Sequence, residues 1–348
     1  MEEKVFNSSS YYFDLPPQFI AQEPVLPRDN CRLLVVERQN PGFKEARFKD
    51  IEGFLNPGDV LVLNDTKVIM ARLKAKTSSG GKLEVFLLKD KKDNTWEVLV
   101  NPGKRARLGA VVHFDKSCLK AIITGVTPQG TRMIKFESSN LKKDLESLGQ
   151  VPTPPYIKKE VKQKSLYQTV YAKNQGAIAA PTAGLHFTKK LLSRIANKGV
   201  RIVYITLHCG LATFRPVKTN DIRNHPMDSE WINLASSAAT AINKAKARGG
   251  RVFAVGTTAV RTLESLAQPS GDFGWKVSPF CGATNFYIVP GYKFKIIDAL
   301  ITNFHTPGST NLILVSAFCN LDKISQSYAF AQKESFRFYS FGDAMLIM

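Results

Sequence analysis

The sequence predicts an α/β (α+β) protein with a mixed sheet core, covering helices and an inserted small antiparallel β-barrel domain. Three observations support this class. The chain has 348 residues, a length typical of about two domains. Short strand-like runs separated by turns fill residues 67–150, whereas helices and strands alternate after about residue 165. We therefore expect 1–66 and 151–348 to form a discontinuous core that carries the active site, and 67–150 to form the barrel.

The first part of the core contains two predicted strands. Arg32–Val36 is a short apolar run rich in β-branched residues. Asn56–Asp59 has the proline and glycine of a turn, and Val60–Leu63 follows it as a buried strand.

The inserted segment repeats short strand-like runs at close intervals. Gly, Asp, Asn and Pro turns separate these runs, a rhythm that favours a small antiparallel barrel over βαβ units. The prolines of residues 150–155 have no backbone N–H to donate and favour extended conformations, so this stretch cannot be regular structure. We interpret it as the exit from the insert. The predicted strands are Val68–Leu73, Lys82–Leu88, Trp96–Val100, Val111–Phe114, Lys120–Gly125 and Arg132–Phe136.

Beyond residue 165, helices and strands alternate. Thr188 can cap a helix in which Leu191, Leu192 and Ile195 share one face, and Gly199 ends it. The run 312–319 is apolar, and its periodicity fits either a helix or a strand. The predicted elements are helices at Thr188–Lys198, Ser236–Arg248 and Gly256–Ala267, and strands at Val200–Thr206 and Arg251–Val255.

Charge is the unusual feature of the composition. The formal net charge is +19, and residues 65–175 hold 22 Lys and Arg against 10 Asp and Glu. Such an excess indicates a polyanionic partner, nucleic acid first and an anionic membrane second, unless it reflects a general lysine bias of the proteome. The predicted RNA contacts are Lys104, Arg105, Lys158, Lys159, Lys162 and Lys164.

Cysteine usage and targeting signals point to the cytoplasm. The five cysteines include no CxxC pair, so zinc and iron–sulfur sites find no support. The N-terminal residues lack the apolar region of a signal peptide, and the longest apolar stretches fall short of the roughly 20 residues of a membrane helix. We expect a cytoplasmic monomer that has no membrane partner.

Two segments of small and polar residues adjoin predicted helices or strands. Residues 179–188 precede a helix and contain Thr182, Gly184 and His186, which suit close approach of an anion and proton transfer. A tight loop with a satisfied histidine is an equal alternative. Residues 206–216 follow a strand and contain His208 and Arg215, at the edge where α/β sheets gather catalytic groups.

A third segment joins a strand to a helix through Gly256, Thr257 and Thr258. This arrangement favours nucleotides, but it contains neither GxGxxG nor GxxxxGK[ST]. Arg261 and Glu264 lie three residues apart on the helix, and a surface ion pair is the simpler interpretation of them.

A fourth segment, residues 298–310, contains Asp298, Asn303 and His305 around the end of a strand-like run. A single histidine is more often structural, but three histidines in loops of one kind are harder to explain as structural residues. No HxH or HExxH spacing links them, so we expect no metal. We also interpret Cys209, beside His208, as a buried inert thiol rather than a nucleophile.

Taken together and in order, these segments resemble the S-adenosylmethionine:tRNA ribosyltransferase-isomerase family of queuosine biosynthesis. The resemblance runs from Tyr12 to Ile347. It rests on YFDLPP with AQEP near the N-terminus, GDVLVLNDT at 58–66, APTAGLHF at 180–187, the 208–216 loop, GTTAVRTLE at 256–264, TNFH at 302–305 and FGDAMLI at 341–347.

The resemblance implies an activity. Such an enzyme takes tRNA with a GUN anticodon that carries 7-aminomethyl-7-deazaguanine at the wobble position. It transfers and isomerises the ribosyl moiety of S-adenosylmethionine, gives epoxyqueuosine-tRNA, and releases adenine and methionine. S-adenosylmethionine is then a co-substrate, and no other cofactor is expected. The alternatives are a non-catalytic basic RNA-binding protein and an S-adenosylmethionine-dependent RNA methyltransferase, which the missing glycine-rich nucleotide loop disfavours.

That chemistry assigns expected roles to the segments. A base must remove a proton beside the sulfonium, an acid helps adenine leave, and the methionine carboxylate needs an arginine or a helix N-terminus. The catalytic candidates are His186, His208, His305 and Asp298. The substrate-binding candidates are Thr182, Gly184, Arg215, Gly256, Thr257, Thr258, Arg261, Glu264 and Asn303. Arg215 and Arg261 would bind anions, and Glu264 or Asp298 would hold a cation or orient a histidine.

Overall fold

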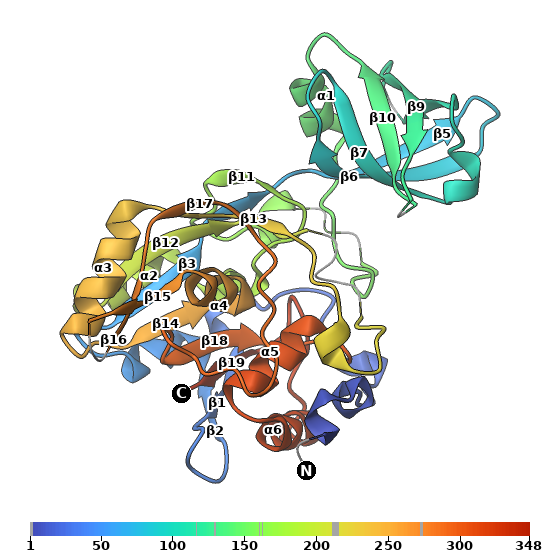
Figure 1. Ribbon diagram of the computed structural model, residues 1–348. Coiled ribbons are helices and arrows are strands. Elements are labelled where there is room, and N and C mark those ends of the chain that lie inside the picture. Colours follow the sequence, from blue (N-terminus) through green and yellow to red (C-terminus); the bar gives the residue numbers. More distant parts are fainter. Residues whose placement is uncertain are drawn as a thin grey trace.

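The computed structural model describes residues 3–115, 117–128, 130–159, 161, 163–210, 216–271 and 274–348. Its core is a nine-stranded mixed sheet with the strand order β17-β13-β12-β3-β14-β18-β19-β1-β2 (Figure 1). In that order the strands are Phe280–Thr284, Glu230–Leu234, Arg201–Leu207, Val60–Asn64, Val252–Val255, Ala299–Asn303, Ala344–Ile347, Arg32–Val36 and Lys44–Arg47. The central strands β12, β3, β14 and β18 run parallel, and β13, β17 and β2 pair antiparallel at the two sides.

Helices cover both faces of this sheet because its central strands are apolar on both sides. In β3, Val60 and Val62 join one core cluster, whereas Leu61 and Leu63 join another. The first cluster lies under α3, α4, α5 and α6, and the second lies under α2. These helices are α2 Lys189–Asn197, α3 Ser236–Ala247, α4 Gly256–Ser265, α5 Thr310–Phe318 and α6 Leu321–Lys333.

The inserted segment forms a closed antiparallel barrel in the order β10-β7-β6-β5-β8-β9, which Figure 1 shows standing to one side of the core. It has an apolar core of its own, built by strands whose buried and solvent-facing residues alternate. The elements are β5 Arg72–Thr77, β6 Lys82–Asp90, β7 Thr95–Asn101, β8 Val111–Phe114, β9 Lys120–Val126, β10 Arg132–Glu137 and the helix α1 Leu141–Leu148. The predicted fold class is confirmed.

One predicted helix is shorter in the structure, and a strand takes the place of its last part. The helix that begins at Gly256 stops at Ser265 rather than Ala267, since Pro269 follows and residues before proline avoid the helical region. Residues 267–270 instead form β15, which pairs with β16. The bounds are β15 Ala267–Ser270 and β16 Gly274–Val277.

The predicted strand at 68–73 is divided between the two parts of the molecule. Its first residue belongs to β4, Thr66–Val68, which pairs with β11, Asn174–Ala177, in the core. Its last residues begin β5 of the barrel. The ambiguous apolar run at 312–319 is helical and belongs to α5, whose N-cap Ser309 accepts a hydrogen bond from the Leu312 amide.

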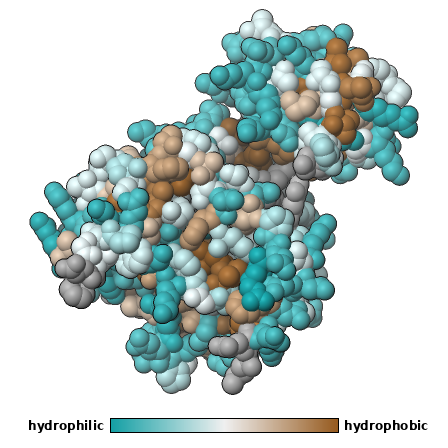
Figure 2. All heavy atoms as spheres, viewed as in Figure 1, coloured by the Kyte–Doolittle hydropathy of each residue, from teal (hydrophilic) through white to brown (hydrophobic). Residues whose placement is uncertain are grey.

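Short 3-10 helices shape the remaining loops. They are η1 Lys4–Phe6, η2 Ser8–Tyr11, η3 Pro17–Phe19, η4 Arg28–Asn30, η5 Phe48–Phe54, η6 Gly103–Arg105, η7 Lys164–Tyr167, η8 Thr182–His186 and η10 Ile222–Asn224. Hydrophilic residues cover much of the visible surface of both parts (Figure 2). Among the described residues, no helix combines the length and the apolar character needed to cross a membrane.

Candidate active site

A pocket lies where β14 and β18 end, against the first turns of α4 and α5. Its volume is about 70 Å³, so it encloses a small group of a ligand rather than a whole nucleoside. The lining brings together residues from all four segments singled out in the sequence, with the 206–216 segment represented by Cys209 alone. Its residues are Tyr156, Ala179–Ala183, Cys209, Gly256–Thr258, Thr302–Thr306, Asn311, Tyr339 and Ser340.

The N-terminus of α4 opens into this pocket. Its first residue, Gly256, has φ +82°, a left-handed conformation that glycine adopts without strain. The residue before it, Val255, provides no side-chain cap for the helix. The first backbone N–H groups of α4 have no acceptor within the helix itself, and the helix dipole favours negative charge there.

His305 is the one imidazole among the described residues that line the pocket. Its Nε2 lies 2.8 Å from Thr302 Oγ1, and its backbone N–H donates to Tyr328 Oη at 2.7 Å. Burial lowers the pKa of His305 to about 3. The ring is consequently neutral near pH 7, the form in which one ring nitrogen can accept a hydrogen bond.

His186 lies behind the pocket wall, not on it. It is 4% exposed, packs on Phe48 with ring centroids 5.0 Å apart, and has both ring nitrogens engaged. Asn303 Nδ2 donates to His186 Nε2 at 3.1 Å, so Nδ1 carries the proton and faces Cys31 Sγ at 3.1 Å. Burial lowers the pKa of His186 to about 3, and nearby Arg28 adds to this effect.

Asn303 connects His186 to the pocket, because it contacts His186 and also lines the pocket. Its Nδ2 also donates to the Tyr339 carbonyl at 3.0 Å, and its Oδ1 faces the Thr182 hydroxyl at 3.5 Å. All three contacts fit one orientation of the amide. His186 thus fixes the orientation of Asn303, and Asn303 together with Thr182 faces the pocket.

His208 lies beside the pocket, next to the lining residue Cys209. Its Nδ1 is 2.8 Å from Thr66 Oγ1, and its ring stacks on Trp231 with centroids 4.8 Å apart. Burial lowers the pKa of His208. Cys209 is 3% exposed, which confirms the prediction that it is buried, and burial raises the pKa of its thiol.

Two other candidates lie away from the pocket. Asp298 precedes β18, at the end opposite the pocket, and its carboxylate accepts the Val252 N–H at 2.8 Å. Gly184 does not line the pocket, and a Cβ atom there would lie 2.0 Å from Tyr171 Oη. Its lack of a side chain serves the packing of η8.

Arg261 and Glu264 are both buried and do not form the expected surface pair. Arg261 pairs with Glu230 through Nη1, and its Nε donates to the Phe286 carbonyl at 3.0 Å. Its buried Nη2 makes no hydrogen bond within the part of the chain that the structure describes.

Glu264 holds the loop that follows Tyr292. Its carboxylate accepts the backbone N–H groups of Lys295, Ile296 and Ile297 and the Tyr292 hydroxyl, at distances of 2.9 to 3.0 Å. With these four donors its role is to position the 292–297 loop.

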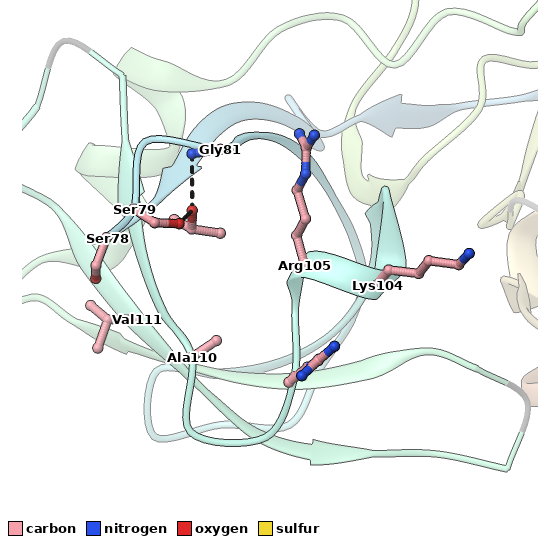
Figure 3. Close-up of a pocket in the computed structure, with 9 residues that line it drawn as sticks. Ser78, Ser79, Gly81, Lys104, Arg105, Ala110 and Val111 are labelled. Atoms are coloured by element: carbon pink, nitrogen blue, oxygen red, sulfur yellow. Dashed lines mark hydrogen bonds between the residues drawn. The ribbon is translucent and has the colours of Figure 1, made fainter.

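A second pocket lies on the barrel and is basic and open. Its volume is about 520 Å³, and Figure 3 shows Lys104 and Arg105 on one side of it, opposite Ser78 and Ser79. Arg105 Nη1 donates to the Lys82 carbonyl at 3.0 Å. The described lining contains no carboxylate; its residues are Thr77, Ser78, Ser79, Gly81, Lys104, Arg105, Arg107, Ala110 and Val111.

A cleft of about 820 Å³ runs between the barrel and the core. The predicted RNA contacts Lys158, Lys159 and Lys164 line it, together with the acidic Asp115. Lys159 already pairs with Glu23 at 2.9 Å, and Lys164 Nζ contacts the Glu146 carbonyl at 3.3 Å. Two further candidates, Lys162 and Arg215, lie outside the described residues.

Several residues of the pocket were not predicted from the sequence. Asn311 accepts the Thr257 hydroxyl at 2.9 Å, and its position one residue into an apolar helix could have identified it. Tyr156 and Tyr339 come from loops that no motif marks. Within the described ranges, no three His, Cys, Asp or Glu side chains gather in a way that could hold a metal ion.

Comparison with known proteins decides the family. The family model described as queuosine biosynthesis protein matches residues 8–347. The chain belongs to this family. It is 51% identical over 342 residues to the S-adenosylmethionine:tRNA ribosyltransferase-isomerase of Caldanaerobacter subterraneus subsp. tengcongensis, covering 98% of this chain and 99% of the relative. The enzyme of the same name from Desulforamulus reducens is 48% identical over 342 residues, again covering 98% of this chain and 99% of the relative.

A solved structure supports the same relationship. The crystal structure of S-adenosylmethionine tRNA ribosyltransferase from Thermotoga maritima is 34% identical, with a TM-score of 0.56 over 97% of this chain and 100% of that chain. The relatives are named as enzymes of one kind, so the predicted family and the predicted transferase and isomerase class are confirmed. The two alternative classes are not favoured.

Proposed function

We propose that the protein transfers and isomerises the ribosyl moiety of S-adenosylmethionine onto 7-aminomethyl-7-deazaguanine at the wobble position of tRNA with a GUN anticodon. The products are epoxyqueuosine-tRNA, adenine and methionine. The observation that carries this proposal is the 51% identity over 98% of the chain to a relative named for that activity. S-adenosylmethionine is a co-substrate in this proposal, and no cofactor or metal takes part.

The core pocket would bind the methionine end of S-adenosylmethionine. Its volume suits a carboxylate and an ammonium group better than a nucleoside. The carboxylate would accept hydrogen bonds from the backbone N–H groups at the start of α4, at Gly256, Thr257 and Thr258. The ribose and adenine would then lie at the mouth of the pocket, where tRNA can reach them.

His305 and Asn303 would act on the reacting atoms. The sulfonium acidifies the neighbouring ribose carbon, and His305 would accept the proton that leaves it, because it is the imidazole that lines the pocket and Thr302 and Tyr328 hold it there. Asn303, with Thr182 behind it, would hydrogen-bond to the ribose or to the departing adenine. His186 would position Asn303. His208, which lies beside the pocket and contacts Thr66, would contribute indirectly, through the residues that it contacts. Asp298 and Glu264 already accept buried N–H groups, so we assign them to the support of the fold.

The Arg261–Glu230 pair would support the pocket from the side of α4. The free Nη2 of Arg261 keeps this residue a candidate for binding an anion, as Arg215 also is.

The barrel and the interdomain cleft would hold the tRNA. Lys104 and Arg105 line an open pocket free of acidic neighbours, which suits phosphate oxygens. Lys158, Lys159, Lys162 and Lys164 would add contacts along the cleft. We further propose that residues 67–150 fold as a unit, with 1–66 and 151–348 as the core, because the barrel has its own apolar cluster. A cytoplasmic monomer fits a tRNA substrate and unpaired cysteines.

One assay tests the proposed reaction. The protein is incubated with S-adenosylmethionine and precursor tRNA, and the free purine base is measured. Ribosyl transfer releases adenine in step with product, whereas methyl transfer gives S-adenosylhomocysteine and simple binding gives neither. Formation of S-adenosylhomocysteine, or no adenine at all, would contradict the proposal.

A further inference from the structure

Two large aromatic side chains remain exposed on one face of the sheet edge. Tyr204 of β12 is 40% exposed and Trp231 of β13 is 39% exposed. The residues that alternate with them, such as Val203 and Ile232, point into the core. Because Leu207 pairs with Ile232, His208 lies opposite Trp231 on the outer face, with Tyr204 four residues before His208.

The ring of Trp231 is held in place from one side. His208 stacks on it with an interplanar angle of 16°. The His208 ring is in turn backed by Gly176, where an added Cβ atom would lie only 2.6 Å from Nε2. On the other flank, the cross-strand neighbour of Trp231 is Ala283, a small exposed residue of β17. One face of the indole is therefore supported and the other is left open.

No described helix covers this part of the sheet. The apolar cluster beneath α2 includes residues of β3, β14 and β18, but none from the described parts of β13 or β17. The other outward residues on these two strands are Asn233, which is half-buried, and Cys281, which is exposed. The surface is aromatic, small and weakly polar, and the Asp65 carboxylate beside it is buried and accepts hydrogen bonds from Thr206 and Asn174.

This surface adjoins the candidate active site. His208 supports Trp231, and the next residue, Cys209, lines the pocket. The Cys209 carbonyl accepts the Ile178 N–H at 3.0 Å, just before the Ala179–Ala183 wall of the same pocket. A ligand that extends out of the pocket past Cys209 would meet the indole of Trp231.

We propose that Trp231, backed by His208, stacks an unpaired anticodon-loop base next to the nucleotide that is modified. The proposal rests on the proposed function. An enzyme that acts on a base must take it out of the stack, and the neighbouring base then loses a stacking partner. An open indole face replaces that partner whichever base is present, because every base has a π face.

RNA fits this surface better than a protein partner does. The chain carries a net charge of +19, which attracts a polyanion, while the aromatic surface itself is small. A supported ring with one open face is the feature that single-stranded RNA recognition uses. Phosphates would be bound elsewhere, by the lysines and arginines of the barrel and the cleft.

The test measures binding of two RNA probes to the full chain. One is a GUN anticodon stem-loop, and the other is a fully paired duplex with the same stem. We expect Trp231→Ala to weaken stem-loop binding by roughly 5- to 150-fold, the range for removal of one stacking platform. Trp231→Phe should keep most of the affinity, and duplex binding should be unchanged in both variants.

Two further variants make the test specific. Trp275, on β16 of the β15–β16 hairpin, is a tryptophan of similar exposure, 37%, whose ring contacts the Lys295 ammonium group. The Trp275→Ala variant should bind the stem-loop as the wild type does. Trp231→Leu keeps apolar volume in the strand without a ring, so it should behave like Trp231→Ala. Wild-type affinity in Trp231→Leu, or an equal loss of stem-loop and duplex binding, would overturn the proposal. Adenine release by the wild type is scored separately, so failure of the reaction and failure of the stacking surface are distinguishable.

Discussion

The core pocket and the barrel pocket differ in size, exposure and charge. The core pocket is small, lies at helix N-termini and contains a neutral histidine held by neighbouring hydroxyl groups. The barrel pocket is open, several times larger and lined by exposed Lys104, Arg105 and Arg107. Hydrogen bonds in a desolvated pocket are directional and resist screening, whereas exposed charges act at a distance and weaken with salt. We therefore assign the chemistry to the first pocket and the retention of tRNA to the second.

The largest effect is expected at the core pocket. His305→Gln keeps a polar side chain beside Thr302 but removes the proton acceptor. Adenine release should fall by roughly 10²–10⁴-fold at every salt concentration, the usual contribution of a general acid or base. The matched control is His113→Gln, on β8 of the barrel, which should release adenine at the wild-type rate. Normal turnover in His305→Gln would remove this residue from the reaction.

The next effect separates a residue that binds substrate from one that supports the fold. Glu264→Ala leaves the N–H groups of Lys295, Ile296 and Ile297 without an acceptor, and the last two of these are buried. Each unsatisfied group costs about 1–3 kcal/mol, so the free energy of unfolding should fall by more than about 3 kcal/mol. Denaturant unfolding measures this loss. Normal stability with weakened S-adenosylmethionine binding would instead make Glu264 a ligand-binding residue.

The third prediction concerns pH and the support behind the pocket. The pKa of His186 is about 3 in the folded protein, below the value near 6.5 of an unfolded chain. Between these two values the unfolded state binds more protons, so the contribution of His186 to stability is lost as pH falls below 6.5. At pH 5 this loss is about 2 kcal/mol.

Thermal unfolding at a series of pH values checks that slope. His186→Gln removes the titrating group, so the stability of this variant should fall less steeply between pH 6.5 and pH 5 than that of the wild type. Identical slopes in the two proteins would show that His186 does not carry the effect.

The smallest effect is expected on the barrel. Replacing Lys104 and Arg107 by alanine removes two cations, so the slope of log K for tRNA against log salt should become shallower by roughly 0.7 to 0.9 for each phosphate that is no longer neutralised. Affinity for S-adenosylmethionine should not change. Lys120→Ala with Lys135→Ala removes two exposed lysines of β9 and β10 outside the pocket and provides the control. An equal change of slope in both pairs would mean that the barrel acts only through its total charge.

The sequence predicted those features that depend on neighbours along the chain. Thr188 does cap α2, with its hydroxyl accepting the Leu191 N–H at 3.1 Å, and the barrel strands follow their turns. Functional residues of α/β sheets gather beyond the carboxyl ends of the parallel strands, and this rule correctly placed Asn303 beside Gly256 and Thr257 in one pocket. The same rule, applied strictly, places Asp298 at the opposite end of its strand.

Features that depend on contacts between distant residues were not predictable. The ring of His186 lies behind the pocket wall because Phe48 and Cys31, more than a hundred residues earlier, pack against it. Arg261 and Glu264 share a helix, yet their partners come from β13 and from the loop after Tyr292. Spacing on one helix indicates which side chains can meet, but burial decides which of them do.

The division of labour between the two pockets is tested most directly by adenine release at limiting and at saturating tRNA. We predict that His305→Gln stays slow at any tRNA concentration, because its defect lies in the reaction itself. The Lys104→Ala and Arg107→Ala double variant should be slow at limiting tRNA and reach the wild-type rate at saturation. A double variant that stays slow at saturating tRNA, or a His305→Gln protein restored by added tRNA, would contradict this division.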